Sequence, residues 1–235
     1  MRTLIDNDNR TERKTALLAN ELARYNIDIA ALSETRFSGE DQLTEPDSGY
    51  TIFWSGKCEK ERRVAGVGFA VKNTLIDKIE QPVGVNERIM TLRIPLAANR
   101  YMTIISVYAP TLVSSEEDIM SFYHALRTLV TKIPKSESVV ILGDFNARVG
   151  SDNDIWKPLG PFGVGNVNSN GLLMLQLCTE LDMVLTNSFF YQKKEHKATW
   201  FHPQSKHGHL LDYIVCRHSD LMNFCKVKVY AWCRL

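Results

Sequence analysis

The stretch Val139-Val140-Ile141-Leu142-Gly143-Asp144-Phe145-Asn146-Ala147 decides the fold of this chain. Its apolar, largely β-branched start predicts a buried strand that stops at Gly143. Asp144 and Asn146 follow two positions apart, so both polar side chains point to the same side at the carboxyl end of the strand, where α/β sheets usually place their chemistry. An acid beside an amide that orients water suits metal-assisted hydrolysis. An Asx turn that closes the strand explains the same residues equally well.

The composition is that of an ordinary globular protein, with 235 residues, 44% of them hydrophobic and 23% charged. This length suits one large domain over residues 1–235. No apolar stretch is long enough to span a bilayer, and the first residues lack the apolar core of a signal peptide. The five cysteines form no CxxC pair, which argues against a disulfide framework or zinc site. We therefore expect a reducing, intracellular location, nuclear or cytoplasmic rather than secreted.

The net charge of +1 neither favours nor excludes a polyanionic partner. Basic residues nevertheless gather in two places, where either a solvated loop or a contact with phosphates would explain them. These two clusters are Lys57, Lys60, Arg62 and Arg63, and Lys193, Lys194 and Lys197.

Apolar side chains at helical spacing predict helices over residues 13–25, 116–133 and 171–181. Besides the strand before Asp144, apolar runs predict strands at 27–32, 50–54, 66–71, 88–94, 101–108, 183–186, 198–201 and 210–216. Short links between the strands from 50 to 108 predict an antiparallel meander. The pattern predicts a single domain of two packed sheets with helices outside them.

Several other polar residues lie where strands or helices end. Glu34 follows an apolar strand, where a solvated side chain is the simple explanation, and Tyr108 ends a strand just before Pro110, where packing would explain it. Asp212 lies within an apolar strand, which is costly unless the carboxylate is paired or liganded. Asn168 and Asn170 precede Gly171 and suit the cap of the third helix.

Six short segments, in their order along the chain, resemble the endonuclease/exonuclease/phosphatase superfamily, and most of all the apurinic-endonuclease-like domain of LINE-type (non-LTR) retrotransposons. They are Ser33-Glu34-Thr35, Tyr108-Ala109-Pro110, Gly143 to Ala147, Asn170-Gly171, Thr199-Trp200 and Leu211-Asp212-Tyr213-Ile214. The resemblance runs from Arg2 to about Val229. It implies an α/β fold, the four-layer α/β/β/α sandwich of the DNase I-like type, with the active site at one rim between the sheets.

The resemblance also implies roles for individual residues. Glu34 would be the main ligand of Mg²⁺, with Mn²⁺ as the other metal expected. Asp144 would activate or position the attacking water, and Asn146 would hold that water or the scissile phosphate. Asp212 would orient a catalytic histidine.

Further residues would contact the phosphate. Tyr108 and Asn170 would hydrogen-bond it and stabilise the charge that develops there. Thr199 and Trp200 lie in a stretch close to the rim in relatives, so that Thr199 is a phosphate-binding candidate, although Trp200 would also suit the core.

The sequence departs from the family pattern at both ends. Relatives begin with a strand that ends in Trp-Asn-Val-Arg-Thr-Leu, of which only Arg2-Thr3-Leu4 is present, and they end with a Ser/Thr-Asp-His segment that is absent. We therefore expect a truncated domain that lacks terminal strands and leaves Asp212 without its histidine. His207 and His209 are near in sequence, but their spacing does not suit them as replacements.

These observations lead to three functional expectations. The first is Mg²⁺-dependent phosphodiester hydrolysis by a monomeric DNA endonuclease of the retrotransposon type, with DNA as partner, no membrane association and an incomplete active site. The second is a catalytically inactive, retrotransposon-derived remnant that binds nucleic acid or protein. The third is a phosphatase of small phosphoesters or lipids, because the fold alone does not choose the substrate.

Overall fold

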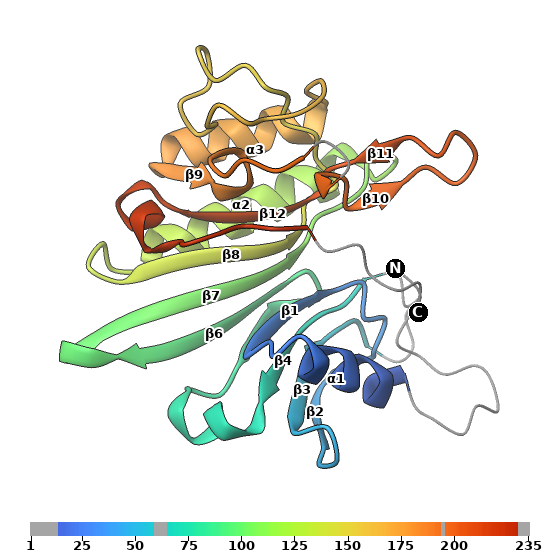
Figure 1. The fold of residues 1–235 in the computed structure, drawn as a ribbon, viewed down its shortest axis with the longest axis vertical. Coiled ribbons are helices and arrows are strands. Elements are labelled where there is room, and N and C mark those ends of the chain that lie inside the picture. Colours follow the sequence, from blue (N-terminus) through green and yellow to red (C-terminus); the bar gives the residue numbers. More distant parts are fainter. Residues whose placement is uncertain (1–13, 59–64, 194–195, 230–235) are drawn as a thin grey trace. The chain divides into compact units, whose positions relative to one another are not determined.

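The computed structural model describes residues 14–58, 65–193 and 196–229. The chain divides into two compact units, residues 1–108 and 109–235, which are described separately below (Figure 1). The motif at Arg2-Thr3-Leu4 lies outside the described residues, as do Lys60, Arg62, Arg63 and Lys194 of the two basic clusters.

The first unit contains one α-helix and two sets of antiparallel strands. Its elements are α1 (Lys14–Arg24), β1 (Ile29–Ser33), β2 (Glu40–Glu45), β3 (Tyr50–Ser55), β4 (Val67–Lys72), η1 (Asn73–Lys78), β5 (Val83–Asn86), β6 (Ile89–Leu96), η2 (Ala97–Asn99) and β7 (Arg100–Tyr108). One sheet has the strand order β1-β4-β3-β2. In the other set, β6 pairs with both β5 and β7.

The predicted single meander is wrong in its connectivity, although every pairing in this unit is antiparallel. The neighbours of β4 are β3 and β1, so both of its edges are occupied and the chain leaves through η1 to begin a second set of strands. Strand β2 was also not predicted, because Glu40–Glu45 is largely polar. Strand pairing therefore depended on a long-range partner, β1, that no local pattern reveals.

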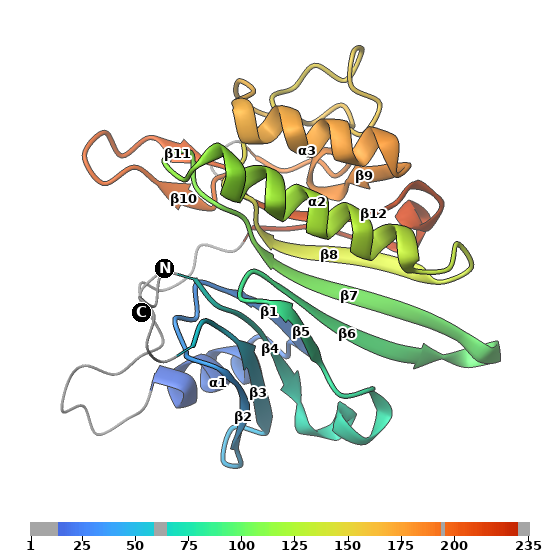
Figure 2. The same ribbon diagram turned by 180° about the vertical axis from the view of Figure 1, so that it is seen from behind.

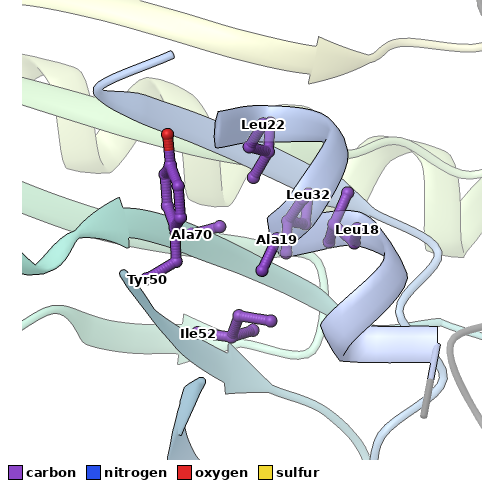
Figure 3. Close-up of a cluster of buried hydrophobic side chains, with 7 residues drawn as sticks. All are labelled: Leu18, Ala19, Leu22, Leu32, Tyr50, Ile52 and Ala70. Atoms are coloured by element: carbon purple, nitrogen blue, oxygen red, sulfur yellow. The ribbon is translucent and has the colours of Figure 1, made fainter. Parts of the chain in front are cut away.

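Helix α1 covers one face of the four-stranded sheet (Figure 3). Its side chains Leu18, Ala19 and Leu22 pack against residues from three of the strands, as the helical spacing predicted. These contacted residues are Leu32, Tyr50, Ile52 and Ala70. The alternate residues Phe53 and Phe69 are also buried, so the sheet is covered on both faces, and β6 and β7 pack against β4.

The second unit contains a sheet of three strands, β8, β12 and β9, with two helices on one face, and a separate hairpin formed by β10 and β11. Its elements are α2 (Glu116–Lys132), β8 (Ser138–Asp144), α3 (Ser169–Glu180), β9 (Met183–Leu185), η3 (Thr186–Ser188), β10 (Trp200–Phe201), β11 (Gly208–His209), β12 (Asp212–Arg217) and η5 (His218–Asn223). Strand β12 pairs antiparallel with β8 on one side and β9 on the other. Both views show α2 and α3 side by side over this sheet (Figure 2).

The position of Asp212 differs from the expectation. It is not inside the strand but is the first residue of β12. The preceding Leu210 and Leu211 belong to the connection from β11, which is why the apolar pattern placed the strand too early.

Candidate active site

The turn that follows β8 is held by four hydrogen bonds, three to the surrounding backbone and one within the turn. The carbonyl of Asp144 accepts from the amide of Ala109 at 2.8 Å, and the amide of Phe145 donates to the carbonyl of Leu211 at 3.0 Å. The Asp144 Oδ1 accepts from the amide of Asn146 at 2.8 Å, which is an Asx turn. The Asn146 Nδ2 donates to the carbonyl of Ala109 at 2.9 Å. Both interpretations of this sequence therefore apply, since the Asx turn also fixes the two polar side chains.

Asn146 adopts a left-handed conformation with φ of 47°. Such a conformation is costly for most L residues, and asparagine is among the few that tolerate it. Residues held in this region often cluster at functional sites. The preceding residue, Phe145, is only 1% exposed and anchors the turn in the core.

Asn170 supports this turn from α3. Its Nδ2 donates to the carbonyl of Pro110 at 2.9 Å and to that of Asn146 at 3.3 Å, and Tyr123 donates to the backbone carbonyl of Asn170 at 2.9 Å. Both amide hydrogens are thus used within the protein, while Oδ1 has no partner among the described residues and the residue is 1% exposed. Asn170 positions the Asn146 turn, and a direct phosphate contact stays a prediction.

The two candidate capping residues of α3 have different tasks. Asn168 is the cap, because its Oδ1 accepts from the amide of Gly171 at 2.8 Å. The same atom accepts from the amide of Arg148 at 3.0 Å, which ties the helix to the segment after Asn146. A Cβ atom on Gly171 would lie 1.8 Å from the carbonyl oxygen of Arg148. Glycine is therefore required where the helix meets this segment.

Asp212 lies directly opposite Asp144 in the pairing of β12 with β8. The Thr199 Oγ1 accepts from the amides of Leu211 at 3.0 Å and Asp212 at 3.2 Å. Desolvation by surrounding atoms raises the pKa of the Asp212 carboxyl, while a hydrogen bond with Thr199 opposes that change. Thr199 thus supports Asp212, and its predicted phosphate contact stays a prediction.

The β10–β11 hairpin carries an aromatic cluster formed by Trp200, His202, His207 and His209. The Trp200 ring stacks on His209 at 5.9 Å, and His207 lies 5.0 Å from His209. Trp200 is 38% exposed, so the alternative that it belongs to the core is wrong. Desolvation, followed by the charges of Arg148, His207 and His202, lowers the pKa of His209.

The two remaining candidates lie in the first unit. Glu34 directly follows β1 and forms an ion pair with Arg36. Tyr108 is the last residue of β7 and is largely buried. Its carbonyl accepts from Arg88 Nη1 at 3.1 Å, and the Arg88 guanidinium lies 5.5 Å from the centre of the Tyr108 ring. Sequence reasoning identified neither arginine, although Arg36 comes only two residues after Glu34.

The donor chemistry of these residues fits a hard divalent cation. Glu34, Asp144 and Asp212 are carboxylates, the ligands that Mg²⁺ and Mn²⁺ prefer. Like charges directly opposite in a ladder are destabilising, so the pair of Asp144 and Asp212 would gain from a nearby cation. Within the described residues, however, no group of three or more His, Cys, Asp or Glu side chains is arranged to hold a metal.

The second basic cluster is only partly free to meet a ligand. Lys197 Nζ donates to the carbonyl of Phe162 at 2.7 Å, and desolvation lowers the pKa of this amine. Its role in the structure is thus a contact with the loop before α3. A phosphate contact by the cluster stays a prediction.

Comparison with known proteins shows the family to which the chain belongs. Residues 5–226 match the endonuclease/exonuclease/phosphatase family, and the chain belongs to this family. It is 32% identical over 204 residues to craniofacial development protein 2 of Bos taurus, which covers 87% of this chain and 33% of that protein. The chain thus spans about a third of the length of this curated relative.

Solved structures confirm the fold class. The endonuclease domain of TRAS1, a telomere-specific non-LTR retrotransposon, aligns with a TM-score of 0.58 and 18% identity over 88% of this chain and 81% of that one. The 3′ phosphatase NExo (D146N) from Neisseria, bound to a product DNA hairpin, aligns with a TM-score of 0.61 and 15% identity over 89% and 83%. The expected DNase I-like α/β fold, with several sheets and helices, is thereby confirmed.

Proposed function

We propose that this chain is a metal-dependent phosphodiester hydrolase that nicks DNA, an endonuclease of the retrotransposon type. The observation that carries the proposal is the pairing of Asp144 with Asp212 beside the hydrogen-bonded Asn146. Membership in the family supports hydrolysis of phosphate esters in general. The choice of DNA is supported by the retrotransposon endonuclease and the DNA-bound phosphatase among the similar structures.

In this proposal the two aspartates have different tasks. Asp144 accepts a proton from the attacking water, because its carboxylate is held at the strand end by the amide of Asn146. Asp212 contributes negative charge from the opposite strand and is held by Thr199. Asn146 orients the water or the phosphate with an amide group that Ala109 fixes in place. The rigid turn lowers the cost of ordering these groups during the reaction.

The other candidates keep the roles implied by the family resemblance. Glu34 would hold the metal, and Tyr108 would hydrogen-bond the phosphate. Mg²⁺ or Mn²⁺, when bound, would neutralise the charge that develops on the phosphate oxygens. The residues of the chain supply the proton transfer and the positioning.

The setting of the protein is a further part of the proposal. Four cysteines, Cys58, Cys178, Cys216 and Cys225, are free among the described residues, which supports a reducing intracellular location. No helix in the part of the chain that the structure describes has both the length and the apolar character needed to cross a membrane. We propose that the chain acts as a monomer.

A second candidate function is binding of DNA without hydrolysis. It is favoured by the surroundings of Asp212, whose side-chain partner is Thr199, while the rings of His207 and His209 contact each other and that of His209 stacks on Trp200. If Asp212 has no imidazole to orient, proton transfer would be slow. In this second candidate function the fold is the same and DNA is bound, but the phosphodiester bond is not cleaved.

Nicking of supercoiled plasmid by the purified protein in Mg²⁺ tests the proposal. Asp144→Asn should lower the rate by about 10²- to 10⁴-fold, the usual loss when a general base is removed, and EDTA should abolish nicking. Asp152→Asn is the matched control, because this exposed aspartate also accepts a backbone hydrogen bond in the same unit. Nicking that persists in Asp144→Asn would contradict the proposal. DNA binding by fluorescence anisotropy without any nicking would establish the second candidate instead.

A further inference from the structure

We propose that Arg36 is an internal cation that occupies the carboxylate of Glu34 and competes with a divalent metal for it. The inference deepens the proposed function and rests on it, since it concerns the metal-binding role of Glu34. The two residues are separated by Thr35 alone, and Arg36 Nη2 donates to Glu34 Oε1. A metal that binds this carboxylate must therefore share it with the guanidinium or displace it.

The backbone of this turn is unusual and brings the two side chains together. Glu34 and Arg36 both have φ of 58°, in the left-handed region that L residues other than asparagine and aspartate rarely adopt. The left-handed conformation is unfavourable for each of these residues. Two of them separated by one residue indicate that the surrounding structure imposes the conformation.

The packing around Thr35 shows what imposes it. Thr35 is completely buried, and its amide donates to the carbonyl of Gly66 at 3.0 Å. A Cβ atom on Gly66 would lie 2.4 Å from Thr35 Oγ1 and 2.9 Å from the amide nitrogen of Arg36. On the other side of the turn, the rings of Phe37 and Trp54 lie 4.8 Å apart. The turn is therefore built into the unit and is not a free surface loop.

Within the part of the chain that the structure describes, Arg36 does not have a full set of hydrogen-bond partners. Its Nε is buried and has no partner among the described residues. A buried donor without an acceptor is unfavourable, so the attraction of the Glu34 carboxylate is what keeps the guanidinium there. Once a metal neutralised this carboxylate, that attraction would be lost and the arginine would be released.

The positive charge of Arg36 determines the direction in which metal affinity should change when this residue is replaced. A guanidinium stays protonated at all physiological pH values, so it opposes a second cation near Glu34 under all such conditions. Arg36→Met removes the charge, keeps much of the side-chain length, and should strengthen metal binding. Arg36→Lys keeps the charge and should bind metal much as the wild type does. If Arg36 instead positioned Glu34 to receive the metal, Arg36→Met would weaken binding.

Binding of Mn²⁺, followed by electron paramagnetic resonance in the absence of DNA, tests the inference. We expect the dissociation constant of Arg36→Met to be about two- to fivefold lower than that of the wild type, the effect of a partly exposed ion pair. The gain should disappear when Glu34→Gln is combined with Arg36→Met. Arg93→Met is the matched control, because Arg93 pairs with Glu80 at 2.7 Å and its side chain, like that of Arg36, is 38% exposed.

The inference is overturned if Arg36→Met binds Mn²⁺ equally or more weakly, if Arg93→Met gives the same gain, or if neither the wild type nor Arg36→Met binds the ion. Circular dichroism and the thermal midpoint establish that each variant is folded, and Arg36→Gln provides a second neutral variant. Since the measurement contains no DNA, its result is separate from the plasmid assay. A chain that binds the metal as expected but does not nick DNA would refute the proposed function alone.

Discussion

Asp144, the last residue of β8, and Asp212, the first residue of β12, are direct partners in the antiparallel ladder between these strands. Directly opposite residues project from the same face of a sheet, so two carboxylates lie next to each other there. The two carboxylates repel each other unless a cation lies nearby or one of them is protonated. Carboxyl groups whose pKa is shifted by desolvation and a close neighbour are typical of functional sites.

The first prediction is that Asp212→Asn stabilises the protein and impairs its activity. The substitution removes the repulsion from Asp144 and the cost of desolvating a charge, while the amide can still hydrogen-bond Thr199. We expect the free energy of unfolding in urea without metal to rise by about 0.2–1 kcal/mol, and plasmid nicking to fall. Asp152→Asn serves as the control for a change of one charge. A loss of stability in Asp212→Asn would show that the two carboxylates do not repel each other.

The second prediction concerns Gly171, where α3 touches the segment after Asn146. Gly171→Ala should lower the free energy of unfolding by about 1–3 kcal/mol, because the new methyl group would overlap the carbonyl of Arg148. Gln176→Ala, on the exposed side of the same helix, should change it by less than about 0.5 kcal/mol. Chemical denaturation measures both. An unchanged stability of Gly171→Ala would mean that the helix can move away from Arg148 without cost.

The third prediction separates the backbone of Asn146 from its amide. Asn146→Gly should lose only about 0.5–1.5 kcal/mol of stability, for the hydrogen bond to Ala109, since glycine readily adopts positive φ, but should nick DNA far more slowly. Asn146→Val should lose both activity and about 2 kcal/mol of stability, because a β-branched residue is poorly accommodated at this φ. Thermal unfolding and the plasmid assay distinguish the two variants. Equal stabilities would show that φ at this position is not constrained.

The fourth prediction is a pH dependence that originates in the β10–β11 hairpin. The folded structure lowers the pKa of His209 below its ordinary value of 6.5, so the unfolded chain takes up a proton first on acidification. This contribution to stability is present above about pH 6.5 and is lost as the pH falls. In His209→Gln, the free energy of unfolding in urea should therefore fall less between pH 7.5 and 5.5 than it does in the wild type.

The exposed His124 provides the control for that measurement, since replacing it with glutamine removes a histidine from the same unit, away from the aromatic cluster. If His124→Gln and His209→Gln had the same effect on the pH dependence, the hairpin would not be its source. Quenching of Trp200 fluorescence follows the hairpin itself, because the indole stacks on His209.

The elements with strong apolar periodicity could be predicted from the sequence, and the pairings between them could not. Helix α2 ends within one residue of its predicted range because its apolar stripe is regular. The short strand β11 was missed, since Gly208–His209 has no apolar pattern. The register that places Asp144 opposite Asp212 depends on which strands become neighbours, and this is a property of the whole unit.

The candidate site shows the same division. The spacing of Asp144 and Asn146 predicted a turn with two fixed polar groups, and the structure contains it. The neighbouring asparagines were indistinguishable in sequence, yet Asn168 caps α3 while Asn170 binds Pro110 and Asn146. Only the packing of the helix end decides which side chain turns inward. Arg36 carried a local signal, its position two residues after Glu34, that a search for ion pairs would have found.

The left-handed backbone at Asn146 has a consequence for how such sequences evolve. If the proposed role of its amide is correct, the residue is constrained both by that role and by a turn that accepts few other side chains. In a protein that had lost its activity, most substitutions at this position would still destabilise the fold. The Gly-Asp-Phe-Asn sequence would therefore persist after the loss of catalysis. In this family the motif is therefore evidence of the fold, whereas loss of activity would be expected first at side chains that contact only the substrate.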